Sequence, residues 1–178
     1  MDIGVISVRY AKALLKSACQ ENLDEQVYHE MQTLSANYLK VPELRFTIDN
    51  PMLEKETKRQ LLETACGAEP SSLTKRFIAL VLQEGRENVM QFMAASYITL
   101  YRKQKNITRG RLITATPVGQ ATEQRMREMV VSRTSGTVEF ESEVNPDIIG
   151  GFILEYDTYR MDASVKTKLN SILNTLKK

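Results

Sequence analysis

Apolar residues recur at helical spacing through the first two thirds of the chain, with long stretches that lack glycine and proline. Potential caps and breakers, among them Asn22, Pro42, Gly67 and Ser71, separate these stretches. The pattern predicts long helices over Ile6–Cys19, Leu23–Val41, Leu53–Cys66, Leu73–Glu84 and Glu87–Lys105. Their short connections favour antiparallel packing, so we expect a mainly α protein that opens with a helical bundle.

The pattern changes after about residue 106, where β-favouring residues begin to alternate with polar ones. Strands are predicted over Arg111–Thr116, Thr137–Val144, Ile148–Tyr156 (interrupted by Gly150-Gly151) and Tyr159–Asp162, and helices over Thr122–Arg133 and from Ser164 through Leu176. We therefore expect a boundary between residues 106 and 110, with a helical domain over 1–106 and a small α+β domain over 107–178.

The width of the apolar face differs between the predicted helices. In Leu23–Val41 and in the last helix, most apolar residues fall within about 80° to 100° of arc, which is one core-facing stripe. In Ile6–Cys19 they cover about 240°, and in Leu73–Glu84 most of the circle. These two helices have more apolar surface than a small bundle needs.

Two interpretations of the wide faces remain open on this pattern. Both helices can be central elements, covered on several sides by their own chain. Alternatively, they lie side by side and leave a groove for an amphipathic helix of another protein. Small residues such as Ala11, Ala18 and Ala79 suit either a tight core or a close guest helix.

Composition and charge give little support to nucleic-acid binding. The 178 residues are 42% hydrophobic, and 24 basic against 22 acidic side chains leave a formal charge of +2. A dedicated nucleic-acid binder carries a stronger positive footprint. The alternative function that we weigh is an adaptor that binds nucleic acid through a basic stretch at the domain boundary, made of Arg102, Lys103, Lys105, Arg109 and Arg111.

No motif for catalysis, metal binding or phosphate binding is present in the sequence. The single histidine, His29, has no second ligand at metal-binding spacing, and Cys19 and Cys66 form no CxxC pair. We expect no catalytic residue, cofactor or metal, and a hydrolase would lack a nucleophile–base pair. The longest apolar run is Phe77–Leu82, and no secretory signal begins the chain, so we expect a cytoplasmic compartment.

Several ordered segments resemble the delta subunit of the bacterial rotary ATP synthase, the counterpart of the mitochondrial oligomycin-sensitivity-conferring protein. They are Arg9–Leu14, Asn50-Pro51, Phe77–Leu82 with Gly85-Arg86, Leu112–Pro117, and Val144–Phe152 followed by Asp162–Val165. The stretch Glu155–Tyr159 departs from the family, which often has a glycine there.

The resemblance implies an N-terminal six-helix bundle, with a short helix over Pro42–Ile48 counted third, and a smaller C-terminal domain without an active site. It also implies that the first and fifth helices hold the N-terminal helix of a catalytic-head α subunit, and these are the two helices with wide apolar faces. The groove residues that we expect are Val8, Tyr10, Ala11, Leu14, Leu15, Ala18, Phe77, Ala79, Leu80 and Val81.

The C-terminal domain is implied to contact the b subunits of the peripheral stalk. Our candidates are Ile148, Ile149, Phe152, Leu169 and Leu173, which core packing explains equally well. The resemblance thus implies a non-catalytic stator linker, present once in a proton- or sodium-driven complex. It implies a peripheral place on the cytoplasmic face of the cell inner membrane, held through the complex and without insertion.

A charged residue at Leu80 or Ala11 is expected to weaken binding of an α-subunit peptide while the domain stays folded. Because the chain is nearly neutral and the expected groove does not rely on ion pairs, which salt screens, we expect the binding to depend little on salt concentration.

Overall fold

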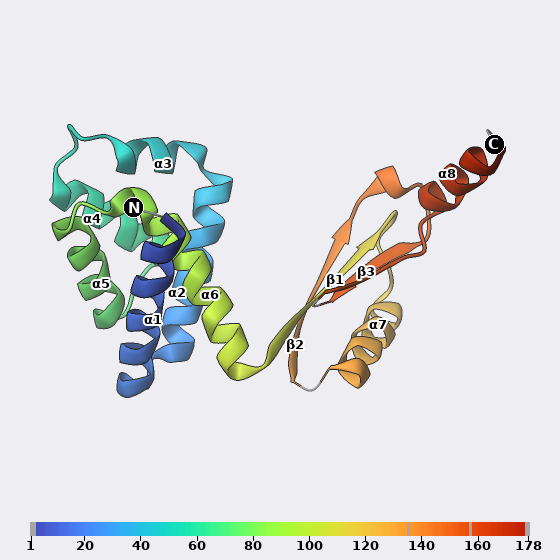
Figure 1. The fold of residues 1–178 in the computed structure, drawn as a ribbon, viewed down its shortest axis with the longest axis horizontal. Coiled ribbons are helices and arrows are strands. Elements are labelled where there is room, and N and C mark those ends of the chain that lie inside the picture. The colour runs from blue at the N-terminus through green and yellow to red at the C-terminus, as the bar shows by residue number, and fades with distance from the viewer. Residues whose placement is uncertain (1–2, 135, 157, 177–178) are drawn as a thin grey trace. The chain divides into compact units, whose positions relative to one another are not determined.

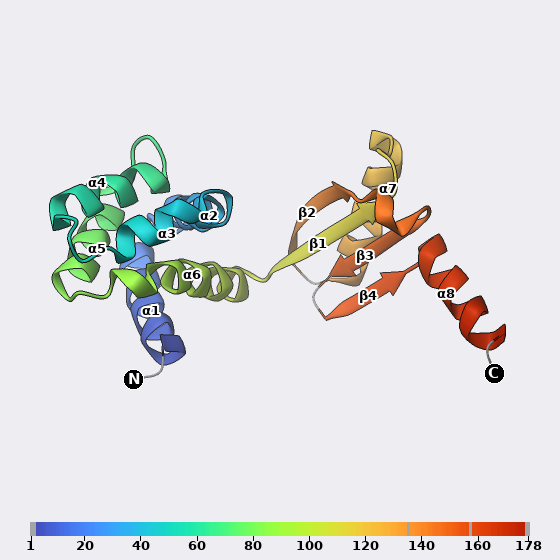
Figure 2. The same ribbon diagram turned by 90° about the horizontal axis from the view of Figure 1, so that it is seen from above.

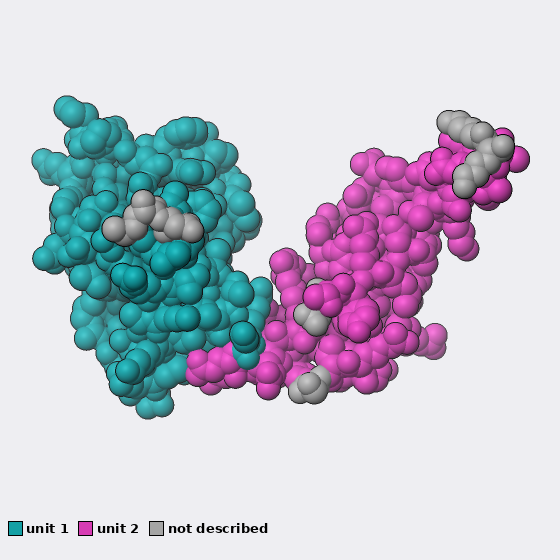
Figure 3. Space-filling model, in the orientation of Figure 1, with its two compact units in different colours: residues 1–103 teal, residues 104–178 magenta. Residues whose placement is uncertain are grey.

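The computed structural model describes residues 3–134, 136–156 and 158–176. The chain divides into two compact units, residues 1–103 and 104–178 (Figure 3). The break falls three residues before the end that we expected for the helical domain. The protein is mainly helical, and its four-stranded sheet lies in the second unit (Figures 1 and 2).

The first unit is built from helices that pack around one apolar core. Its elements are α1 (Ile3–Glu21), α2 (Asp24–Lys40), α3 (Pro42–Asp49), α4 (Lys55–Cys66), α5 (Ser72–Gln83), the 3-10 helix η1 (Glu87–Val89) and α6 (Met90–Lys105). Fully buried side chains from α2, α4, α5 and α6 fill the core, among them Met31, Leu62, Ile78 and Tyr97. The helix predicted over Glu87–Lys105 begins three residues later, at Met90, because Glu87–Val89 form a 3-10 helix.

Local signals fix where these helices begin and end. Pro42 occupies the first turn of α3, where its missing N–H is not needed. Gly67 ends α4 with φ +138°, a conformation that favours glycine. The Ser71 hydroxyl accepts a hydrogen bond from the Thr74 N–H at 3.2 Å and so caps α5.

The second unit is a four-stranded sheet with two helices. Its elements are β1 (Ile107–Thr114), α7 (Gln120–Arg133), β2 (Thr137–Val144), the 3-10 helix η2 (Pro146–Ile148), β3 (Phe152–Tyr156), β4 (Tyr159–Asp162) and α8 (Val165–Leu176). The strand order is β2-β1-β3-β4. β1 and β2 run parallel through the α7 crossover, and the other two pairs are antiparallel.

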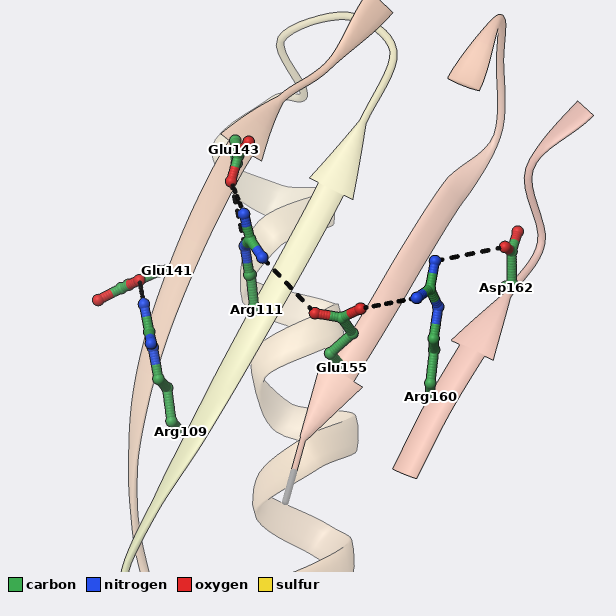
Figure 4. A network of polar contacts seen from close by, with 7 residues as sticks. All are labelled: Arg109, Arg111, Glu141, Glu143, Glu155, Arg160 and Asp162. Atoms are coloured by element: carbon green, nitrogen blue, oxygen red, sulfur yellow. Dashed lines mark hydrogen bonds and ion pairs between the residues drawn. The ribbon is translucent and has the colours of Figure 1, made fainter. Parts of the chain in front are cut away.

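The two faces of the sheet differ in polarity. α7 covers one face, where Leu112, Val130, Leu154 and Tyr156 form a core. On the opposite face a chain of ion pairs crosses the strands (Figure 4), made of Arg111–Glu143, Arg111–Glu155, Arg160–Glu155 and Arg160–Asp162. Arg109 and Glu141 form a separate pair on the same face. Ile113, Ile148 and Ile153 form a second, smaller cluster. Exposed ion pairs stabilise a fold by only about 0–1 kcal/mol each, so the α7 side carries most of the packing energy.

The prediction of one strand over Ile148–Tyr156 is wrong. Ile148 ends η2, and β3 begins only at Phe152. Ile149 and Gly151 have φ of +70° and +74°, which bends the chain between them. A Cβ on Gly151 would lie 2.2 Å from the Ala163 carbonyl oxygen, so this bend requires glycine.

Candidate binding surfaces

A cleft of about 520 Å³ lies between α1 and α5. The two helices run antiparallel there. At one end, Arg76 Nη2 contacts both carboxylate oxygens of Glu21 at 2.7 and 2.8 Å. At the other end, Arg86 Nη1 donates a hydrogen bond to the Tyr10 hydroxyl at 2.9 Å. These two contacts mark the ends of the cleft.

The middle of the cleft is apolar and its ends are polar. Ala13, Leu14, Leu73, Phe77 and Leu80 line the middle. Phe77 is only 7% exposed and forms the floor, whereas Leu80 is 47% exposed and can still bury surface against a guest. The polar and charged residues of the lining are Arg9, Tyr10, Ser17, Glu21, Arg76, Glu84 and Arg86.

The structure brings together only part of the predicted groove set. Tyr10, Leu14, Phe77 and Leu80 line the cleft. The others do not line it: Ala11, Leu15, Ala18 and Val81 are buried, and Val8 and Ala79 are exposed elsewhere.

The substitution test that we expected at Ala11 does not suit the structure. Ala11 is 0% exposed, so a charge there would disrupt the fold itself. Leu80 remains a suitable test position.

Sequence reasoning missed several residues of the cleft. Arg9, Ala13 and Ser17 follow one another along α1 at intervals of four residues, which places them on the same face of the helix. This spacing is visible in the sequence. The partners Glu21 and Arg76 are 55 positions apart, and no local pattern reports their meeting.

Buried Glu30 of α2 holds the beginning of α5. Its carboxylate accepts hydrogen bonds from the Ser71 N–H at 2.7 Å and from the Ser71 hydroxyl at 2.9 Å, and it also accepts one from the Thr74 hydroxyl. A buried carboxylate needs such partners to offset the loss of water. The contacts fix the N-terminal end of one wall of the cleft.

A buried ion pair supports the chain just beyond the other end of α5. Lys58 Nζ of α4 contacts Glu87 Oε1 of η1 at 2.8 Å, and Lys58 is almost fully buried. Burial alone would raise the pKa of Glu87, but the hydrogen bond and charge of Lys58 lower it overall. Glu87 is therefore held as a carboxylate.

In the second unit, α8 presents an uncovered apolar stripe. None of its described side chains is buried, and the exposed large apolar residues are Val165, Leu169, Ile172, Leu173 and Leu176. Of the five stalk candidates, Leu169, Leu173 and Ile149 are exposed. Ile148 is buried in the smaller cluster, and Phe152 packs against the α7 side of the sheet.

The start of α8 is fixed by a network of hydrogen bonds. Asp162 Oδ1 accepts from the Ser164 hydroxyl at 2.6 Å and from the Ser164 N–H at 3.0 Å, and Asp162 Oδ2 accepts from the Thr167 hydroxyl at 3.0 Å. The Ser164 hydroxyl in turn accepts from the Thr167 N–H at 3.2 Å. Hydrogen bonds from Ser164 lower the pKa of Asp162.

The described residues show no cluster of three or more His, Cys, Asp or Glu side chains that could hold a metal ion. Burial raises the pKa of the Cys66 thiol to about 12, so this cysteine is held as an unreactive thiol. Among the same residues, no helix is long and apolar enough to cross a membrane. In the basic stretch, Arg109 and Arg111 pair with Glu141 and Glu143.

Together these features define the class of protein: a helical bundle with an apolar cleft between two helices, followed by a small α/β unit with an uncovered amphipathic helix. The model of the family "ATP synthase delta (OSCP) subunit" matches residues 6–176. A Phocaeicola vulgatus protein named ATP synthase subunit delta is 49% identical over 173 residues, which cover 97% of this chain and 94% of that protein.

Two further comparisons agree. The Bacteroides fragilis ATP synthase subunit delta is 42% identical over 174 residues, which cover 97% of this chain and 94% of that protein. A chain of the cryo-EM structure of the Toxoplasma gondii mitochondrial ATP synthase hexamer matches with a TM-score of 0.70 at 20% identity over 97% of both chains, which shows a shared fold.

The chain belongs to the ATP synthase delta (OSCP) subunit family. This confirms the resemblance noted in the sequence, and it makes the chain a stator component of an F-type ATP synthase. The comparisons give no support to the nucleic-acid adaptor that we weighed as the alternative.

Proposed function

We propose that this chain links the α subunits of the catalytic head to the b subunits of the peripheral stalk. In that position it resists the torque of the rotor on the head and catalyses no reaction itself. Family membership supports this role, and so do the two separate apolar surfaces, one on each unit. We assign residues 1–106, as one six-helix bundle, to the head and residues 107–178 to the stalk.

The cleft between α1 and α5 is our proposed site for the N-terminal helix of an α subunit. Its lining runs along α1 from Arg9 to Glu21, a length of roughly 18 Å at the helical rise of 1.5 Å per residue. That length accommodates about three turns of a guest helix. The partly exposed Leu80, above the floor formed by Phe77, is the observation that supports this site most directly.

The uncovered face of α8 is our proposed site for the stalk. Leu169, Ile172 and Leu173 lie at a spacing of three and four residues, which suits packing against helical segments of the b subunits. Ile149 is exposed just before β3 and is a further candidate. Ile148 and Phe152 contribute to packing within the unit instead.

A mechanical linker needs slow dissociation from both partners. Buried apolar side chains supply this better than exposed ion pairs, which contribute little and weaken in salt. Covering a half-exposed leucine contributes about 1 kcal/mol, and several such residues act together on each surface. The linker would be present once per complex and would be peripheral, on the cytoplasmic face of the inner membrane.

The cleft is tested by adjacent substitutions on α5. The binding probe is a synthetic peptide of the N-terminal segment of the same organism's α subunit, titrated calorimetrically into the full chain. Leu80→Glu is expected to weaken binding at least tenfold, because it places a charge on the apolar lining. Ala79→Glu is the matched control, since Ala79 is exposed on the same helix but outside the cleft, and it should change the Kd less than twofold.

Urea unfolding checks that both variants fold. Leu80 is partly exposed, so the free energy of unfolding should change by only about 0.5–1 kcal/mol in each variant. Equal loss of binding in the two variants would contradict the cleft as the site, as would no loss in either.

A further inference from the structure

The two ends of the cleft carry different net charge. At the end formed by Ser17, Glu21 and Arg76, the single acid and the single base form an ion pair and cancel. At the opposite end, Arg9 and Arg86 face the single acid Glu84, which leaves one positive charge in excess. The apolar middle separates these ends, so a guest helix meets a neutral end and a positive end.

The positive end is also held in position. Arg86 donates to the Tyr10 hydroxyl at 2.9 Å, and its guanidinium carbon lies 5.4 Å from the centre of the Tyr10 ring. The Tyr10 ring in turn packs edge-on against Phe77, with 6.4 Å between the ring centres. Neither contact neutralises the charge of Arg86. In the described part of the chain, neither Arg9 nor Arg86 lies within ion-pair distance of a carboxylate.

We propose that the guest helix of this cleft carries acidic side chains at the end that lies beside Arg9 and Arg86. The proposal rests on the proposed function of the cleft and specifies the chemistry of its partner. Guanidinium groups bind carboxylates with two parallel hydrogen bonds, and Arg86 is already oriented by Tyr10. A guest inserted the other way would leave this excess charge uncompensated and would place its acids beside the Glu21–Arg76 pair.

Charge therefore sets the direction of the guest in the cleft, and apolar contact in the middle sets most of its affinity. Electrostatic complementarity commonly has this division of roles at protein interfaces. Because only one positive charge is in excess, the Kd should change little with salt. The small change that remains should come from Arg9 and Arg86.

The experiment measures the Kd of the same α-subunit peptide for the full chain at low and high salt. Arg9→Glu is expected to raise the Kd about fivefold to tenfold at low salt, and this loss should shrink as salt screens the charges. Arg86→Gln should raise it about threefold. Arg45→Glu, an exposed arginine on α3 outside the cleft, is the matched control and should change the Kd less than twofold.

A second arm identifies the acidic end of the guest. Peptides in which the acidic residues of one end are changed to lysine should bind the unaltered chain more weakly than the original peptide does. The same peptides should bind the Arg9→Glu variant more tightly than the original peptide does. Only one end of the peptide should show this rescue. When the acidic residues of the peptide are replaced by their amides, Arg9→Glu should no longer change its Kd. If Arg9→Glu still raised the Kd of that peptide, the arginines would contact the backbone carbonyls at the C-terminus of the guest helix, and the proposal would be overturned.

The outcomes separate this proposal from the function on which it rests. Loss of binding in Leu80→Glu without any effect of Arg9→Glu or Arg86→Gln would leave the cleft in place and overturn the acidic end. Absence of peptide binding to the unaltered chain would overturn both.

Discussion

At the scale of single residues, Glu30 supports one wall of the cleft through three buried hydrogen bonds to the beginning of α5. Its buried carboxylate joins α2 to Ser71 and Thr74 at the beginning of α5. We predict that Glu30→Ala lowers the free energy of unfolding by about 2 kcal/mol, because it leaves the Ser71 N–H and two hydroxyls without their acceptor. Urea unfolding of the full chain measures this. Glu25→Ala, an exposed glutamate on the same helix, should change it by less than about 0.5 kcal/mol.

The residue scale also shows what the apolar arcs could and could not predict. They marked α1 and α5 as helices with more apolar surface than the bundle needs, and a cleft does lie between these two, lined by Tyr10, Leu14, Phe77 and Leu80. The arcs could not distinguish these lining residues from the buried Ala11, because the width of an apolar face does not reveal which neighbour covers each part of it. α1 packs on α2 as well as on α5, so part of its wide face lies in the core.

At the scale of elements, α8 depends on its first turn. An isolated helix of 12 residues is marginal in water, and no described side chain of α8 is buried. We predict that Ser164→Ala reduces the helicity of α8, because it removes the acceptor of the Thr167 N–H, at a cost of about 1 kcal/mol. Far-ultraviolet circular dichroism and amide exchange of residues 165–176 measure it. Ser171→Ala, an exposed serine within the helix, is the control and should preserve helicity.

The same cap predicts a pH dependence. Hydrogen bonds from Ser164 lower the pKa of Asp162 below its unfolded value of about 3.9. The carboxylate therefore stabilises the start of α8 above that pH, and this contribution is lost as the pH falls through the lowered pKa. The protection of the α8 amides, measured as exchange relative to the intrinsic rate at each pH, should therefore fall at acid pH. This loss of protection should be smaller in Asp162→Asn, which cannot titrate, and an equal loss in both proteins would contradict the assignment.

The sequence predicted an element correctly where a regular alternation of residues runs through the whole segment. It failed where a contact with a distant part of the chain determines the backbone conformation. Thr137–Val144 is a strand with the predicted bounds. The prediction across Gly150-Gly151 failed because Asn145 caps a 3-10 turn through the Asp147 N–H, and because Gly151 packs against the Ala163 carbonyl. That second contact joins residues 12 positions apart, and an apolar pattern cannot report it.

At the scale of the whole molecule, the proposed linker has two surfaces on different units, so a substitution on one should leave the other intact. We predict that Leu80→Glu abolishes capture of the catalytic head while capture of a soluble b-subunit fragment persists. Leu173→Glu should do the reverse, because Leu173 is 47% exposed on α8 and a glutamate there opposes apolar contact without affecting a core. Asn174→Glu, the next residue on the same helix, is the control.

Affinity capture with each partner, on full-length variants, measures both effects. Because the two sites are proposed to share no partner, the loss of each partner in the double variant Leu80→Glu/Leu173→Glu should equal the loss in the corresponding single variant. Each single variant would then release the head from the stalk in a reconstituted complex, although both halves of the chain stay folded. If Leu173→Glu instead weakened capture of the head more than Asn174→Glu does, the head would contact the second unit, and the assignment of one partner to each unit would be wrong.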